Sequence, residues 1–242
     1  MLVSMLNNLA RLNTDAIAYM RVAEYWSVGN LGFAVNGYWG PLLSWLMVPF
    51  LWLGVEPLLA GKLAMLISGG VFFHGSLFLV RSAGLRLSDE LIVAWALALT
   101  IPGWMSNHVT PDLLVAGLMA FALGQAVSPD WLANRRRVLG TGATWGLAYL
   151  AKAVALPVGV VVSVLLALCW RLGQAGNRRA AWRQLGVSLG LLALVAAPWI
   201  TVLSLKYDKP TFSTSGPIAH AIVGPGNDRP APHPFGSTIY QP

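Results

Sequence analysis

Long apolar runs separated by short polar segments dominate this chain. The first run, Leu58–Val80, is long enough to cross the hydrocarbon core of a bilayer, which takes about 20 helical residues. Five further runs complete six candidate membrane spans, several of them short: Leu91–Met105, Leu113–Val127, Val138–Ala151, Ala153–Trp170 and Gln184–Leu205. The pattern predicts an all-α fold, a transmembrane bundle of about six spans with one additional helix at the membrane surface.

The additional helix is predicted for Tyr38–Val55. This segment is apolar enough to span, but it contains Trp39, Trp45 and Trp52, and tryptophan concentrates in the headgroup layer of a membrane. We therefore predict that the helix lies on the outer surface. If it spanned the bilayer instead, the segments before and after it would lie on opposite sides.

Lysine and arginine positions predict the orientation of the spans, because loops rich in these residues stay on the cytoplasmic side. Three alternate loops hold nine of the 16 basic residues: Arg81, Arg86, Arg135, Arg136, Arg137, Arg171, Arg178, Arg179 and Arg183. The loops between them hold only Lys152. If Val138–Trp170 were one long span, two of the basic loops would lie on opposite sides, so we predict a tight hairpin near Lys152–Pro157. The turn at Lys152 and the loop before Asp112 are then outside.

Composition agrees with a membrane protein. The chain is 56% hydrophobic and 10% charged, and its mean hydropathy is +0.63, values that are not typical of a soluble domain. The net charge of +7 comes from short clusters between apolar runs, not from the basic stripe of a nucleic-acid-binding protein. A single cysteine, Cys169, excludes an internal disulfide and a site of several thiolates. Its apolar neighbours predict a buried, inert thiol.

Two carboxylates lie at the outer ends of apolar stretches, Asp15 in NTDAIAY and Asp112 in NHVTPDLL. Carboxylates are costly next to hydrocarbon, so acids at this depth are candidates for function. Other interpretations stay open. Asp15 can be a solvated or capping residue after Asn13, Asp112 can simply begin the helix that follows Pro111, and Lys152 can extend its ammonium to the interface.

Several short motifs follow one another along the chain. They are D-x-x-x-Y-x-x-x-A at Asp15, Tyr19 and Ala23, then Gly29-Asn30, Gly61-Lys62-Leu63, Pro111-Asp112, G-L-A-Y-L-A-K at Gly146–Lys152, and Pro198-Trp199. In this order and spacing they resemble the GT-C class of polytopic glycosyltransferases. The similarity is to the branch that includes protein O-mannosyltransferases and the bacterial aminoarabinose-to-lipid A transferase.

The resemblance implies an enzyme of the bacterial inner membrane that moves a sugar from a polyprenyl-phosphate donor to an acceptor hydroxyl at the outer face. The acceptor would be a glycan, a lipid or a protein. The resemblance implies Asp15 as general base, Asp112 as the group that orients acceptor or base, and Lys152 as the cation facing the leaving phosphate. Tyr19, Glu24 and His220 are further candidates for substrate binding. No cofactor is implied, and the histidines lack the spacing of a metal site.

Departures from the family pattern also matter. Family members have a span before the first acid and further spans after the Pro-Trp loop. We therefore expect residues 1–205, with a first outer loop at 1–57, to be the transmembrane region of a longer enzyme. Residues 206–242 are rich in Pro, Gly and Ser and predict an outer loop. The absence of Glu-Lys-Pro between Asn30 and Tyr38 argues against lipid A as the substrate.

Two other functions remain open. A transporter would be expected to carry ionisable groups near the middle of the bilayer and broken helices in repeated halves. The acids here lie at the boundaries, and no internal repeat is apparent, which favours an enzyme over a transporter or scaffold. A lipid-linked oligosaccharide polymerase or ligase would share the lipid substrate but not the D-x-x-x-Y motif.

Overall fold

The computed structural model describes residues 12–173, 178–216 and 218, and every regular element within them is a helix. The all-α prediction is thus confirmed. Three short helices come first: α2 (Thr14–Ser27), α3 (Leu31–Ala34) and α4 (Pro41–Trp52). Six longer helices follow, and each overlaps one of the six apolar runs: α5 (Pro57–Ser82), α6 (Leu87–Asn107), α7 (Asp112–Val127), α8 (Arg135–Ala151), α9 (Ala155–Gly173) and α10 (Arg178–Tyr207).

Three helices of the described part are long and apolar enough to cross a membrane: Pro57–Ser82, Ala155–Leu172 and Arg179–Tyr207. Helices α4 and α7 are apolar but shorter. The 12 residues of α4 extend over about 18 Å, less than the roughly 30 Å of hydrocarbon in a bilayer. Its length therefore agrees with a surface helix in the Tyr38–Val55 segment.

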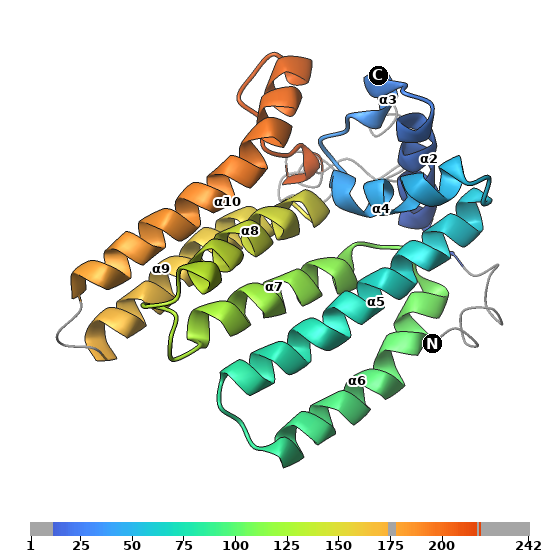
Figure 1. Ribbon diagram of the computed structural model, residues 1–242. Coiled ribbons are helices and arrows are strands. Elements are labelled where there is room, and N and C mark those ends of the chain that lie inside the picture. Colours follow the sequence, from blue (N-terminus) through green and yellow to red (C-terminus); the bar gives the residue numbers. More distant parts are fainter. Residues whose placement is uncertain (1–11, 174–177, 217, 219–242) are drawn as a thin grey trace, which may run out of the picture.

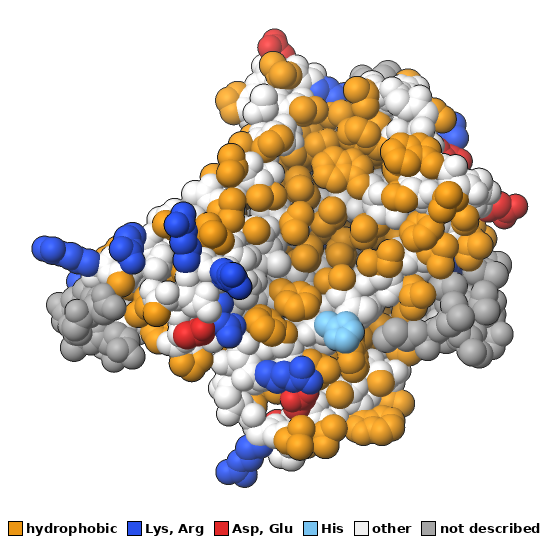
Figure 2. Space-filling model, viewed as in Figure 1, with side chains coloured by type: hydrophobic (Ala, Val, Ile, Leu, Met, Phe, Trp, Pro, Cys, Tyr) orange, Lys and Arg blue, Asp and Glu red, His pale blue; other side chains and the backbone are white. Residues whose placement is uncertain are grey.

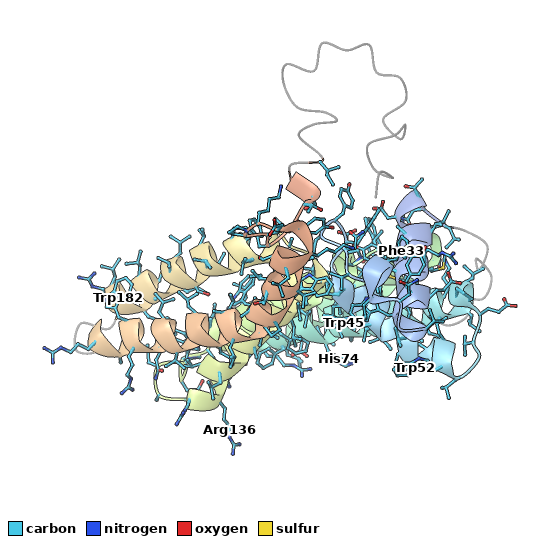
Figure 3. All side chains as sticks on the ribbon, turned by 90° about the horizontal axis from the view of Figure 1, so that it is seen from above. Phe33, Trp45, Trp52, His74, Arg136 and Trp182 are labelled. Atoms are coloured by element: carbon cyan, nitrogen blue, oxygen red, sulfur yellow. The ribbon has the colours of Figure 1, made fainter. Side chains whose placement is uncertain are left out.

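The long helices lie side by side and alternate in direction (Figure 1). Helix α7 packs between α5 and α8, α6 lies against α5, and α9 and α10 lie against α8. The loops at 83–86 and 128–134 share one end of the array, which we call the basic end because Lys and Arg side chains gather there (Figure 2). Arg136 and Trp182 lie at this end, whereas Phe33, Trp45 and Trp52 lie at the opposite end with α2–α4 (Figure 3).

The apolar stretch 138–170 is broken at Lys152. Helix α8 ends at Ala151 and α9 begins at Ala155. Between them the backbone of Lys152 is extended, with φ −154° and ψ 125°, and its N–H still donates to the carbonyl of Ala148 at 2.9 Å. The predicted turn near Lys152–Pro157 is confirmed as a break between two helices that pack against each other.

Glycines allow two pairs of long helices to approach closely. A Cβ at Gly75 of α5 would overlap the carbonyl of Gly117 in α7, and a Cβ at Gly117 would lie 2.6 Å from the backbone nitrogen of Phe72. Between α8 and α10, a Cβ at Gly146 would lie 2.5 Å from the Cβ of Val195. Small residues at such contacts are typical of helices that associate within a membrane.

The end of α10 returns to the segment that follows α2. Lys206 Nζ donates to the carbonyls of Gly32 and Val35, each at 2.6 Å. The hydroxyl of Tyr207 accepts a hydrogen bond from the N–H of Gly37 at 3.2 Å. These contacts join positions more than 160 residues apart and fix the loop between α3 and α4 against the last long helix.

The prediction of a buried Cys169 is wrong, because this thiol is exposed. It lies on the same face of α9 as Val161 and Leu165, which are 56% and 55% exposed. In a helix that contacts lipid, apolar side chains point outward as readily as inward. An apolar sequence neighbourhood therefore does not distinguish a core position from a lipid-facing one.

Substitution of Gly117 by alanine should destabilise the protein by about 1–3 kcal/mol, because the new methyl group overlaps the backbone of α5. The matched control is Gly186→Ala in α10, where a Cβ meets nothing within 4 Å. The two melting temperatures, measured in detergent, should differ clearly. Equal melting temperatures would contradict the close approach of α5 and α7.

Cysteines at positions 136 and 209 should report opposite sides of a membrane. Arg136 is exposed at the basic end and Lys209 is exposed just beyond α10. In a Cys169→Ser protein, a membrane-impermeant maleimide added to intact cells should label Lys209→Cys but label Arg136→Cys only after permeabilisation. Labelling of position 136 alone in intact cells would reverse the orientation, and labelling of both would exclude a membrane between them.

Candidate active site

An ion pair joins Asp112 and Lys152 at the end opposite the basic loops. Asp112 begins α7 and Lys152 directly follows α8, so the two antiparallel helices bring the side chains together. Lys152 Nζ donates to Asp112 Oδ1 at 2.6 Å. The two side chains are 48% and 39% exposed. At this exposure, solvent screening limits the pair to about 1 kcal/mol or less, so it can be broken readily.

The start of α2 is attached to the loop that precedes Asp112. The backbone N–H of Val109 donates to Asn13 Oδ1 at 2.9 Å, across 96 positions of sequence. Asp15 lies two residues further along, in the exposed first turn of α2. The hydrogen bond therefore holds the helix that carries the first acid beside the loop that leads to the second acid.

Tyr19 is electrostatically coupled to both acids. Its side chain is only 4% exposed, and its ring packs edge-on against Trp39 with the centroids 6.5 Å apart. Burial raises the pKa of Tyr19, and the negative charges of Asp15 and Asp112 raise this pKa further. The phenol is therefore neutral at pH 7 and remains a hydrogen-bond donor. The predicted residues Asp15, Tyr19, Asp112 and Lys152 thus lie together at one end of the protein.

A short loop before α4 adds aromatic residues that the sequence analysis did not assign to the site. Asn36 Oδ1 accepts hydrogen bonds from the N–H groups of Tyr38 and Trp39, at 2.7 and 3.2 Å. Gly40 lies against the end of α8, where a Cβ would overlap the carbonyl of Ala151. Tyr38 also raises the pKa of Tyr19. Asn36 was the available sequence signal for this turn, because an asparagine side chain commonly accepts hydrogen bonds from the backbone N–H groups two and three residues later.

Two other predicted residues do not join this group. Glu24 lies at the far end of α2, about 13 Å along the helix axis from Asp15. It pairs with Arg21 at 3.0 Å on an exposed surface and lines a separate hollow with Tyr25. His220 lies outside the residues that the structure describes.

A groove of about 650 Å³ begins one residue after Lys152. Its walls come from the turn, from the start of α9 and from the segment after α10: Ala153, Val154, Pro157, residues 209–216 and Ile218. The Tyr149 hydroxyl donates to the carbonyl of Phe212 at 2.8 Å and fixes that segment against α8. The groove combines an apolar wall with serine and threonine hydroxyls, which suits an amphipathic ligand.

Within residues 12–173, 178–216 and 218, no group of three or more His, Cys, Asp or Glu side chains is arranged to hold a metal ion. No family model matches the chain, and neither a curated protein nor a solved structure matches it. The resemblance to GT-C glycosyltransferases therefore rests on the sequence motifs alone.

Cysteines at positions 13 and 109 should form a disulfide in a Cys169→Ser protein. The hydrogen bond between the Asn13 side chain and the Val109 backbone places the two residues side by side, and a disulfide joins residues whose Cα atoms lie within about 7 Å of each other. Ile17→Cys paired with Val109→Cys is the matched control, since Ile17 is 63% exposed and lies about one turn further along α2. Cross-linking is measured by gel shift after mild oxidation. Failure of the 13–109 pair, or equal cross-linking of the control, would contradict the proximity of α2 to the Asp112 loop.

Proposed function

We propose that this protein is a membrane glycosyltransferase that transfers a sugar from a polyprenyl-phosphate donor to an acceptor hydroxyl at the outer membrane face. One observation carries the proposal. Two carboxylates, a neutral phenol and a lysine, from Asp15, Tyr19, Asp112 and Lys152, lie together where α2, the start of α7 and the end of α8 meet, at the end of the helical array opposite the basic loops. The resemblance to GT-C motifs assigns these residues the roles of a base, a donor and a phosphate-binding cation.

The carboxylates supply the proton chemistry of such a transfer. Asp15 takes the proton of the acceptor hydroxyl while the hydroxyl oxygen attacks the anomeric carbon of the donor sugar. The bond between that carbon and the phosphate oxygen breaks, and the lipid phosphate leaves with the electron pair. Asp112 orients the acceptor beside Asp15. The neutral phenol of Tyr19 donates a hydrogen bond to the sugar or the acceptor.

The leaving group requires positive charge at the membrane boundary. Lys152 meets this need, because an ammonium group stabilises the negative charge that accumulates on the departing phosphate. The groove beside Lys152 offers apolar residues such as Val154 and Phe212 to the first isoprene units of the donor. A cation adjacent to an apolar groove thus matches the two parts of a lipid phosphate.

The proposed orientation follows from the distribution of charge. Loops at the basic end face the cytoplasm under the positive-inside rule, so the four site residues face outward. Helices α6, α7 and α8 complete six spans together with α5, α9 and α10. The 21 residues of α6 extend over about 31 Å, and its exposed apolar residues Trp95 and Leu99 suit contact with lipid. A bacterial inner membrane contains the donor lipid and has the cytoplasmic and outer faces that this orientation requires.

Replacement of Asp15 by asparagine should lower the rate of sugar transfer by about 10²–10⁴-fold, because the amide cannot take a proton. Donor binding should change little. Transfer is measured in proteoliposomes with a panel of radiolabelled polyprenyl-phosphate sugars and an extract of envelope acceptors.

Glu24→Gln is the matched control for this experiment, since Glu24 lies on the same helix but pairs with Arg21 away from the site. It should transfer at the parent rate. If Asp15→Asn also transfers at the parent rate, Asp15 is a helix-capping or solvated residue and the proposed mechanism is wrong.

A further inference from the structure

The carboxylate of Asp112 has a second possible partner built into the chain. The sequence contains two matching tripeptides, Thr110-Pro111-Asp112 before α7 and Ser128-Pro129-Asp130 after it. In the second tripeptide the Ser128 hydroxyl donates to Asp130 Oδ1 at 2.6 Å. In the first, the Thr110 hydroxyl is buried and has no hydrogen-bond partner among the described residues. Asp112 is instead paired with Lys152.

The two aspartates differ in how firmly they are held. Asp130 accepts from Ser128 and Asn134 and pairs with Arg137, and these donors hold the pKa of Asp130 at about 2. Within the described residues, Asp112 makes one side-chain contact shorter than 4 Å to a cation, the exposed bond to Lys152. A pair of this kind is readily exchanged for another anion.

A buried hydroxyl without a partner is unfavourable, because it has lost its hydrogen bonds to water. Thr110 would gain a partner if the Asp112 carboxylate turned away from Lys152 and adopted the arrangement of Ser128 and Asp130. The chain therefore offers Asp112 two positions that differ in which anion occupies Lys152.

We propose that an anionic lipid phosphate takes Lys152 from Asp112, and that the released carboxylate then accepts a hydrogen bond from Thr110. The inference rests on the proposed function for its choice of a polyprenyl phosphate as the anion. In this exchange Thr110 is a positioning residue for Asp112. The exchange also couples the binding of the lipid-phosphate donor to the binding of the acceptor. Asp112 becomes free to orient an acceptor only after the donor phosphate has bound.

The positive charges at and beside Lys152 favour a lipid phosphate as the ligand. Lys152 has three N–H donors and uses one on Asp112, while the groove beside it has a second cation, Lys209, in its wall. If the ion pair stayed intact, a bound phosphate would lie within a few ångströms of the Asp112 carboxylate. Repulsion between the two anions would then weaken binding, so release of Asp112 lowers the free energy of the complex.

The exchange is tested by the binding of farnesyl phosphate to the protein in nanodiscs, without any transfer reaction. Asp112→Asn removes the competing anion and should tighten binding by about three- to tenfold. Lys152→Ala should weaken binding by tenfold or more. Thr110→Val should weaken it several-fold, because the released carboxylate loses its new partner, and Thr110→Ser should restore the parent affinity.

Controls separate this exchange from general effects. Asp130→Asn removes a carboxylate at the basic end and should leave the affinity unchanged, and melting temperatures identify variants that fail to fold. Farnesol and inorganic phosphate are the comparison ligands. Binding of farnesyl phosphate but of neither comparison ligand supports a lipid phosphate as occupant, whereas equal binding of inorganic phosphate points to a free phosphate and overturns that assignment.

Weaker or unchanged binding by Asp112→Asn would overturn the exchange, since it would show that the carboxylate does not compete with the ligand. Equal affinities of Thr110→Val and Thr110→Ser would overturn the role of Thr110. These outcomes are distinct from failure of the proposed function. A protein that transfers no sugar can still show the exchange, and an active transferase can lack it.

Discussion

The break at Lys152, between α8 and α9, determines how the second half of this chain is arranged. Without Lys152 the stretch 138–170 would be apolar enough to continue as one helix. The chain instead leaves α8 at this charged residue and reverses into α9, so that the basic residues at the start of α10 return to the end where α8 began. The same turn leaves the ammonium at the start of α7, beside Asp112. One charge thus determines both the direction of the later helices and the position of the cation in the candidate site.

Helix α2, which carries Asp15, is held in place in a different way. Trp26 of α2, Trp45 of α4 and Trp199 of α10 contact one another in all three combinations, with ring centroids 5.7 to 6.3 Å apart. Aromatic pairs at such distances contribute about 0.5–1.5 kcal/mol each beyond the burial of their surface. Because these rings come from two early helices and from the last long helix, they fix α2 against α10 without any charged contact. Asp15 is therefore exposed to solvent and makes no structural ion pair within the described residues.

The long helices were predictable because length and apolarity define them, and the break at Lys152 followed from the distribution of positive charge. The proximity of the two acids to Tyr19 also agrees with the motif order. Other features depend on contacts between distant segments, which the hydrophobic pattern of the sequence does not reveal. The contact of Gly40 with the end of α8 could not be predicted from the sequence, because it depends on which backbone segments meet. The same holds for the position of Tyr38. Cys169 was placed wrongly because lipid and protein interior favour the same side chains. The number of helices that actually cross a membrane depends on the bilayer as well as on the sequence.

The contacts of Lys206 with Gly32 and Val35 have a consequence for biosynthesis. The segment with Asp15 leaves the ribosome well before α10, because the residues that fix the adjoining loop are made more than 170 positions later. Until α10 has been synthesised and inserted, neither Lys206 nor Trp199 is present to hold this segment against the other helices. A nascent chain that stops before α10 would therefore contain both acids and Lys152 but lack their final arrangement, and the site would be assembled only once α10 is in place.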